Sequence, residues 1–177
     1  MAWSAPMTAV ASSVFTAAQF NTFIRDNLNQ TAPGKATTAG SHFAVSGVNE
    51  ITERLSKSAA VLTSETTTGT TFTDLTTPGP AVTVDTGPSA LVIVHGSMEN
   101  TGTGSSRMGY DISGATTIAA ADNRGVGVFG VAGVGAIHSG VAWHTDLTPG
   151  SNTFTAKYRV SAGTGTFLSR RIVVVPM

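Results

Sequence analysis

The alternation of apolar and polar residues in "NTFTAKYRV" (residues 152–160) constrains the fold more than any other feature of the chain. Every second residue is apolar, and polar residues occupy the positions between them. Successive side chains of a β-strand point to opposite faces, so this period of two predicts a strand with one buried and one polar face. The expected buried residues are Phe154, Ala156, Tyr158 and Val160.

Similar short segments follow one another from residue 59 onward, separated by turn-forming residues. The apolar run at 91–94 predicts a central strand covered on both faces. Residues 107–114 and 115–122 predict two short strands divided at Ser113–Gly114, and the glycine-rich residues 125–143 predict two more. Residues 165–176 predict a last strand that ends at Pro176. Eight to ten short strands with no helical pattern predict a mainly β domain over residues 59–177, an antiparallel β-sandwich of the jelly-roll kind.

A short helix over about residues 16–30 precedes this domain. Thr16 and Gln19 fit a capping box, and Phe15 and Phe20 fit a hydrophobic staple. We expect Pro33-Gly34 to end the helical segment, and residues 31–58 to form an extended linker with one turn of helix at 49–55. The fold class is therefore a β-sandwich preceded by one N-terminal helix and a linker.

The helix carries an apolar stripe too large to remain in water, and Trp3 lies in a stretch with no core of its own. The stripe could pack on its own domain or on another molecule. We expect residues 1–58 to be a docking segment whose interface residues are Trp3, Phe15, Phe20, Phe23, Ile24 and Leu28.

The chain carries few charges: 11% of its residues are charged and the net charge is zero. A neutral chain gives no reason to expect nucleic acid as a partner, and no apolar run is long enough to predict a membrane span. With no cysteine, thiolate metal sites and disulfides are excluded. No secretory signal is recognisable, so we expect a soluble protein that is made and folded in the cytoplasm.

No catalytic constellation stands out. The four histidines lack metal-ligand spacing on a helix, the Gly-x-Ser-x-Gly elbow of serine hydrolases is absent, and the ten acids do not cluster. Residues 100–109, "NTGTGSSRMG", lack the Gly-Lys-Ser/Thr ending of a phosphate-binding loop. We expect no enzyme activity, no metal and no cofactor.

The pattern "W…VFTAAQFNTFIRDNLNQTAPGKA" and the ending "LTPGSNTFTAKYRVSAGTGTFLSRRIVVVP" resemble small minor tail or decoration proteins of tailed bacteriophages, particularly those that infect actinobacteria. The resemblance covers both ends and, more loosely, the middle. It implies a virion structural protein with a β-sandwich assembly module, often trimeric, attached to the particle through its N-terminal part. It carries over no active-site residue.

Two functions follow as expectations. The first is a structural subunit of the virion, on the tail or as head decoration, which forms a homo-oligomer (a trimer) and binds other virion proteins. The alternative is a module that binds a receptor or a host-surface glycan through loops at 100–107 and 124–144, with Arg107, Trp143 and His144 as candidate ligand-binding residues.

Overall fold

The structure is a computed structural model that describes residues 3–130 and 132–177. It is mainly β, with 49% of residues in strands and 9% in helices, and all its strand pairs are antiparallel. The chain divides into two compact units, Met1–Leu55 and Ser56–Met177. The predicted boundary after Ser58 falls inside strand β3 (Lys57–Val61) of the second unit.

The helical part of the first unit runs through α1 (Ala17–Phe20), η1 (Asn21–Arg25) and α2 (Asp26–Leu28). The capping box is present: the Gln19 amide donates to Thr16 Oγ1, and the Thr16 amide donates to Gln19 Oε1. The Phe15 and Phe20 ring centroids lie 6.2 Å apart, as expected for the staple. The middle of the helix is a π-helical turn, which sequence periodicity does not reveal.

A further helical turn, α3 (Ala32–Lys35), includes Pro33 near its start. The expectation that Pro33-Gly34 would end the helical segment is therefore wrong. Proline lacks only an N–H that the first turn of a helix leaves unpaired, so it is well placed there.

Residues 42–54 form a β-hairpin, so the predicted linker and helical turn at 49–55 are also wrong. Strands β1 (His42–Gly47) and β2 (Glu50–Arg54) pair through a tight connection in which Asn49 has a φ of 55°. Asn tolerates this left-handed conformation because its short side chain can hydrogen-bond locally. Glu53 of β2 accepts hydrogen bonds from Ser41, Thr37 and Thr38, which lower its pKa to about 2.

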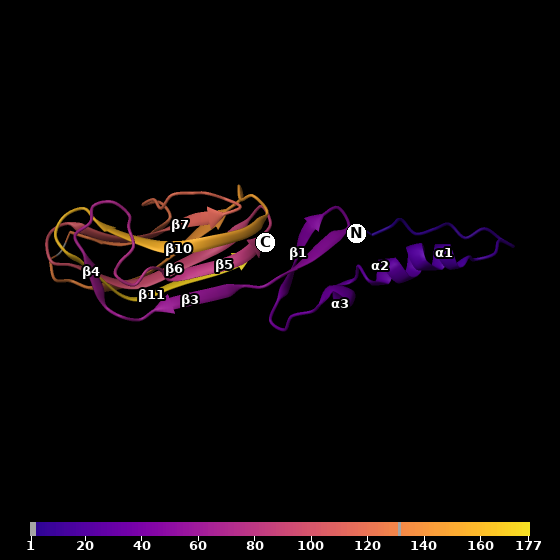
Figure 1. Cartoon of the computed structure of the whole chain (residues 1–177), viewed down its shortest axis with the longest axis horizontal. Coiled ribbons are helices and arrows are strands. Elements are labelled where there is room, and N and C mark those ends of the chain that lie inside the picture. Colours follow the sequence, from indigo (N-terminus) through magenta and orange to yellow (C-terminus); the bar gives the residue numbers. More distant parts are fainter. Residues whose placement is uncertain (1–2, 131) are drawn as a thin grey trace. The chain divides into compact units, whose positions relative to one another are not determined.

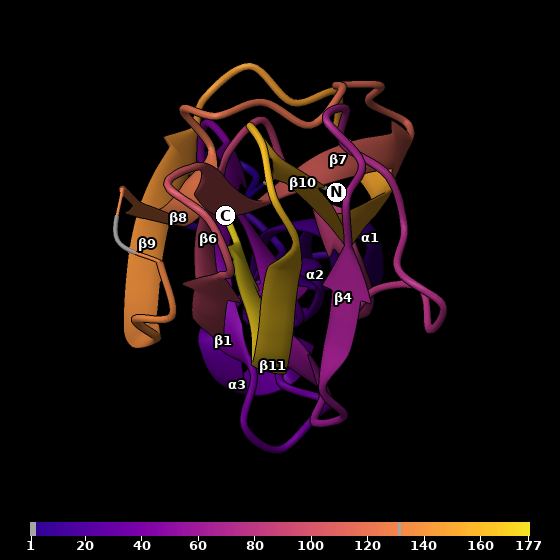
Figure 2. The same ribbon diagram turned by 90° about the vertical axis from the view of Figure 1, so that its left-hand side faces the viewer.

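The second unit contains two sheets (Figure 1). In the four-stranded sheet the order is β5-β10-β7-β8, with β5 (Ala81–Thr86), β10 (Gly150–Val160), β7 (Ser105–Gly114) and β8 (Gly125–Phe129). The five-stranded sheet has the order β3-β11-β6-β9, with β11 (Gly165–Pro176), β6 (Ala90–Asn100) and β9 (Ala136–His144); β4 (Glu65–Thr67) also pairs with β11. Figure 2 shows β8 and β9 at one side of this unit and β4 at the other.

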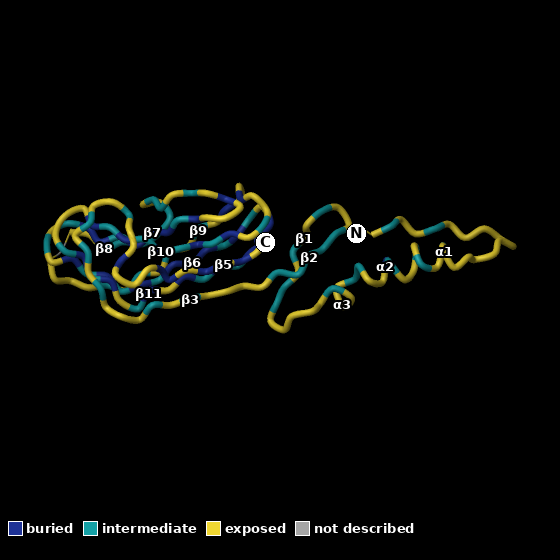
Figure 3. The backbone as a smooth tube through the Cα atoms, viewed as in Figure 1, coloured by how far each residue is buried: buried dark blue, intermediate teal, exposed yellow. Residues whose placement is uncertain are grey.

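Both sheets bury one face in the same hydrophobic core. The predicted alternation in β10 is confirmed, since Phe154, Ala156, Tyr158 and Val160 are all fully buried. Figure 3 shows buried positions alternating with less buried ones along these strands. The core packing explains why every second residue of the central strands is apolar.

Two strand predictions need correction. Residues 115–122 form no strand and contribute only an isolated bridge between Ile118 and Ile112. The run at 91–94 lies in the central strand β6, but only one of its faces is in the core, while Leu91 and Ile93 on the other face are half-buried. Hydrophobicity alone does not tell whether a second covering layer belongs to the same chain.

Arg170 is an unexpected member of the interior. A bulge in β11, with Ser169 at a φ of 53°, turns this arginine into the core, where its side chain is fully buried. Its guanidinium lies 3.5 Å from Glu65 Oε2 and 5.2 Å from the Tyr158 ring centre. A bulge shifts the alternation of a strand by one residue, which explains the position of a charge inside.

Candidate functional site

A hollow lies on the outer face of the four-stranded sheet. It has a volume of about 580 Å³ and is lined by charged residues of β7 and β10 together with the segments 71–74 and 119–120. The Phe72 ring packs over Gly109 of β7, where a Cβ atom would come within 3.1 Å of two ring atoms. Glycine at this position therefore lets the aromatic ring approach the sheet closely.

Lys157 is the central charged group of the hollow. Its ammonium nitrogen lies 2.7 Å from Asp74 Oδ2 and 3.5 Å from Asp111 Oδ2. Partial burial of Lys157 disfavours its charged form, but the hydrogen bond and charges of the two aspartates outweigh this and raise its pKa. Lys157 therefore remains charged at neutral pH and holds both carboxylates at the hollow.

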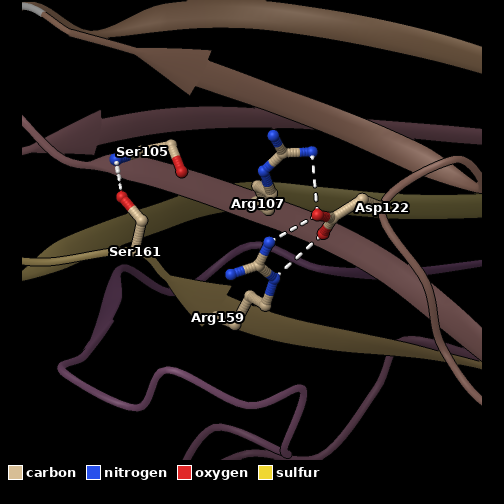
Figure 4. Close-up of polar contacts among 5 residues, drawn as sticks. All are labelled: Ser105, Arg107, Asp122, Arg159 and Ser161. Carbon is tan, nitrogen blue, oxygen red and sulfur yellow. Dashed lines mark hydrogen bonds and ion pairs between the residues drawn. The ribbon is translucent and has the colours of Figure 1, made fainter.

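A second cluster of charged residues, formed by Arg107, Arg159 and Asp122, lies beside it (Figure 4). Arg107 and Arg159 are direct cross-strand partners on β7 and β10, an arrangement that like charges would destabilise. Asp122 lies against both: Arg159 donates to it through Nε at 2.9 Å, and Arg107 Nη1 is 3.4 Å away. The hydrogen bond from Arg159 holds the pKa of Asp122 below its usual value, so the carboxylate stays ionised and neutralises the arginine pair.

These two groups contain six of the 20 acidic and basic residues of the chain, three of each sign. Sequence reasoning placed Lys157 and Arg159 on the polar face of β10 but did not identify the hollow. The missed residues are Phe72, Asp74, Asp111 and Asp122. Asp74 and Asp122 lie in connecting segments whose positions depend on tertiary structure.

The outer face of the five-stranded sheet has the opposite character. Three side chains of β9 are highly exposed there: Ile137 (70%), Val141 (67%) and Trp143 (54%). Cross-strand pairing aligns Val141 with Ile93 and Ile93 with Val173, and likewise aligns Trp143, Leu91 and Val175 in the next row. We call this surface the apolar face; it comprises Leu91, Ile93, Ile137, Val141, Trp143, Val173 and Val175.

Contiguous apolar patches of a few hundred Å² mark interaction sites on soluble proteins. The rows of the apolar face span three adjacent strands, β9, β6 and β11, and contain no charged residue. The next row of the same face is polar: His95 Nδ1 and Ser139 Oγ lie 2.9 Å apart, and Arg171 is the cross-strand partner of His95. This surface is suited to contact with another apolar surface.

The predicted docking residues of the first unit are also accessible. Phe15 and Phe20 are each 47% exposed, Leu28 is 59% exposed, and Trp3 and Ile24 are exposed to a smaller extent. Phe23 is half-buried. The buried Asn27 ties the N-terminal stretch to the helix, since its side chain bonds the backbone N–H and C=O of Ser4. The helix thus presents an apolar stripe to its surroundings.

None of the three candidate ligand-binding residues lies in a loop, which corrects that prediction. Arg107 lies in β7, and Trp143 and His144 end β9 with their side chains on opposite faces. His144 is buried, with its Nε2 2.7 Å from the Tyr110 hydroxyl oxygen. Strand alternation separates these neighbours, so Trp143 belongs to the apolar face and His144 to the interior.

Acid is expected to weaken folding through His144. Burial lowers the pKa of this imidazole, an effect that exceeds the opposing charge of Asp146. Between its ordinary pKa of 6.5 and the lower folded value, the unfolded chain binds a proton that the folded chain excludes. The free energy of unfolding should therefore fall as pH decreases from 7 to 5. Urea titrations should show a shallower fall in His144→Gln, and an equal slope in both proteins would contradict this account.

The comparisons with known proteins identified no relative: no family model matches the chain, and no curated protein matches its sequence. Within residues 3–130 and 132–177, no three His, Asp or Glu side chains are grouped as a metal site would require. No helix in the described part of the chain is long and apolar enough to cross a membrane.

Proposed function

We propose that this chain is a structural subunit of a tailed-bacteriophage particle, on the tail or as head decoration. It assembles as a trimer through the apolar face of its second unit and attaches to other virion proteins through its N-terminal unit. The observation that carries this proposal is the apolar face, because its residues on the central strands β6 and β11 are only half-buried and its residues on β9 are exposed, so the second unit does not cover this face with a layer of its own.

A jelly-roll sandwich is the form we propose for the second unit. Its support is the strand order: β5-β10-β7-β8 and β3-β11-β6-β9 place eight strands around one core, and the short β4 adds a fifth strand to the second sheet by pairing with β11. In the second unit the chain crosses from one sheet to the other six times, at every connection from β4 to β11 except the one between β7 and β8. Eight strands in two such sheets agree with a jelly roll.

A second copy of the chain is the occupant we propose for the apolar face. The continuous apolar runs in β6 and β11 are typical of strands buried on both faces, and the core covers only one. A chain with zero net charge has little long-range repulsion between copies. Edge strand β9 can then pack on the face of the next copy, and three such contacts close a ring.

The exposed helix stripe supports a separate docking role for the N-terminal unit. Phe20 and Ile24 remain accessible on a helix that is already capped and tied through Asn27 to the N-terminal stretch at Ser4. Large aromatic and aliphatic side chains at such positions are typical anchors of protein interfaces. The resemblance to phage structural proteins implies attachment through the same segment.

Charge on the helix stripe should prevent incorporation into virions. Phage genomes would encode Phe20→Asp with Ile24→Asp, or the control Thr22→Asp with Asn29→Asp, which adds the same charge at an exposed position of the helix and at its exposed C-cap. Burying two carboxylates without partners costs several kcal/mol, so we expect at least a roughly ten-fold loss of the chain from purified particles.

Quantitative mass spectrometry of virions measures this loss, and circular dichroism checks that each variant keeps its secondary structure. Normal incorporation of the folded stripe variant would contradict the docking role. Equal loss in the control would show that the stripe itself is not the determinant.

A further inference from the structure

We propose that the hollow over β7 and β10 binds a neutral sugar ring. This inference does not depend on the assembly proposed above, because the hollow and the apolar face lie on different sheets. The hollow and the apolar face are each on the outer side of their sheet, and the shared core lies between the two sheets. A copy bound at the apolar face therefore leaves the hollow open.

The hollow has the dimensions and the rigidity that a sugar site requires. Its volume of about 580 Å³ lies within the roughly 300–1,000 Å³ of small-molecule sites. The segment that carries Phe72 is fixed to β10, since the Thr73 and Tyr158 backbones exchange two hydrogen bonds of 3.0 and 2.9 Å. The phenyl ring is thereby held against Gly109 before any ligand arrives, which reduces the entropy lost on binding.

Phe72 supplies the apolar part of the site. Its ring is half-buried, and the Arg159 guanidinium carbon lies 5.5 Å from the ring centre. An aromatic ring presents a flat, weakly negative face, which suits the C–H face of a pyranose. The sugar hydroxyls, which project from the rim of that ring, would then meet the charged residues around Phe72.

The charged residues supply both the acceptors and the donors with which sugar hydroxyls form hydrogen bonds. The carboxylates of Asp74 and Asp111 accept hydrogen bonds, whereas Lys157 and Arg159 donate them. A hydroxyl can do both at once, so adjacent sugar hydroxyls match this alternation of acceptors and donors. Hydrogen bonds to charged groups are also stronger than those between neutral groups.

The balance of charge favours a neutral ligand over an ionised one. The two acids and two bases that line the hollow cancel, and Lys157 already pairs with both acids. An anion would meet the carboxylates of Asp74 and Asp111, and a cation would meet Lys157 and Arg159. A polyhydroxylated, uncharged ring avoids both repulsions.

Saturation-transfer NMR on the full chain tests this inference with methyl glycosides of neutral hexoses, pentoses and N-acetylhexosamines, alongside glucuronate and glucosamine as charged probes. We expect at least one neutral glycoside to bind with a Kd on the order of 1 mM, and at least about ten-fold more weakly to Phe72→Ala. The matched control is Phe129→Ala, which removes another ring stacked with an arginine (Arg107, 4.6 Å) but outside the hollow.

Loss of binding in Phe72→Ala with retention in Phe129→Ala would support the site. The inference fails if no neutral glycoside binds, if Phe72→Ala binds normally, or if only the charged probes bind. A monomeric chain that still binds sugar would refute the assembly proposal and leave this inference intact.

Discussion

Replacing Val141 with lysine is expected to convert the assembled protein into a monomer of 18.0 kDa. Val141 is 67% exposed on β9, the edge strand of the apolar face, and aligns with Ile93 on β6. In a closed ring, each interface would have to bury the new ammonium group without a partner, at a cost of several kcal/mol. We therefore expect self-association to weaken by at least about 100-fold.

The fold should survive this change because the Val141 side chain points away from the core. Ala81→Lys is the matched control, since Ala81 is an exposed position on β5 in the other sheet. Light scattering should report monomers for Val141→Lys and wild-type mass for Ala81→Lys. An assembled Val141→Lys protein would contradict the assignment of the interface to this face.

Replacing Phe154 with alanine is expected to lower the free energy of unfolding by about 3–5 kcal/mol. Phe154 is fully buried in β10, with its ring centre 6.2 Å from that of Tyr110 and 6.3 Å from that of His144. The truncation would leave a cavity between the sheets, and the two aromatic neighbours would lose a contact.

Urea denaturation in the Val141→Lys background measures this effect without the added stability that assembly contributes by mass action. Thr155→Ala is the control, because Thr155 is the next residue on β10 and points away from the core. It should change the free energy of unfolding by no more than about 0.5 kcal/mol. A loss below about 1 kcal/mol for Phe154→Ala would show that the two sheets do not share a tightly packed core.

Local sequence signals predicted the elements whose structure depends on neighbouring residues. The alternation around Phe154 and Tyr158 predicted the buried face of β10, and Thr16 with Gln19 predicted the capped start of the helix. The hairpin at 42–54 was missed although a local signal was available. Asn49 lies between two runs with alternating side chains, where a residue of positive φ can form a tight turn.

Neighbouring residues in the sequence predict neither the hollow nor the buried arginine. Asp74 and Asp122 come from connecting segments far from Lys157 and Arg159 in sequence, and only the packing of those segments brings them together. Arg170 is in the core because a bulge shifts the alternation of the strand. No residue type near it in the sequence predicts that bulge. Likewise, the apolar residues of β6 do not tell whether the same chain supplies a layer that covers the outer face of this strand.

The mass of the full chain in dilute solution decides whether the apolar face binds further copies of the chain. Sedimentation equilibrium across a hundred-fold range of concentration should give about 54 kDa, three times the 18.0 kDa of one chain, with dissociation only at the lowest concentrations. A constant 18.0 kDa across the whole range would show that the apolar face does not bind a second copy, and would contradict the proposed assembly.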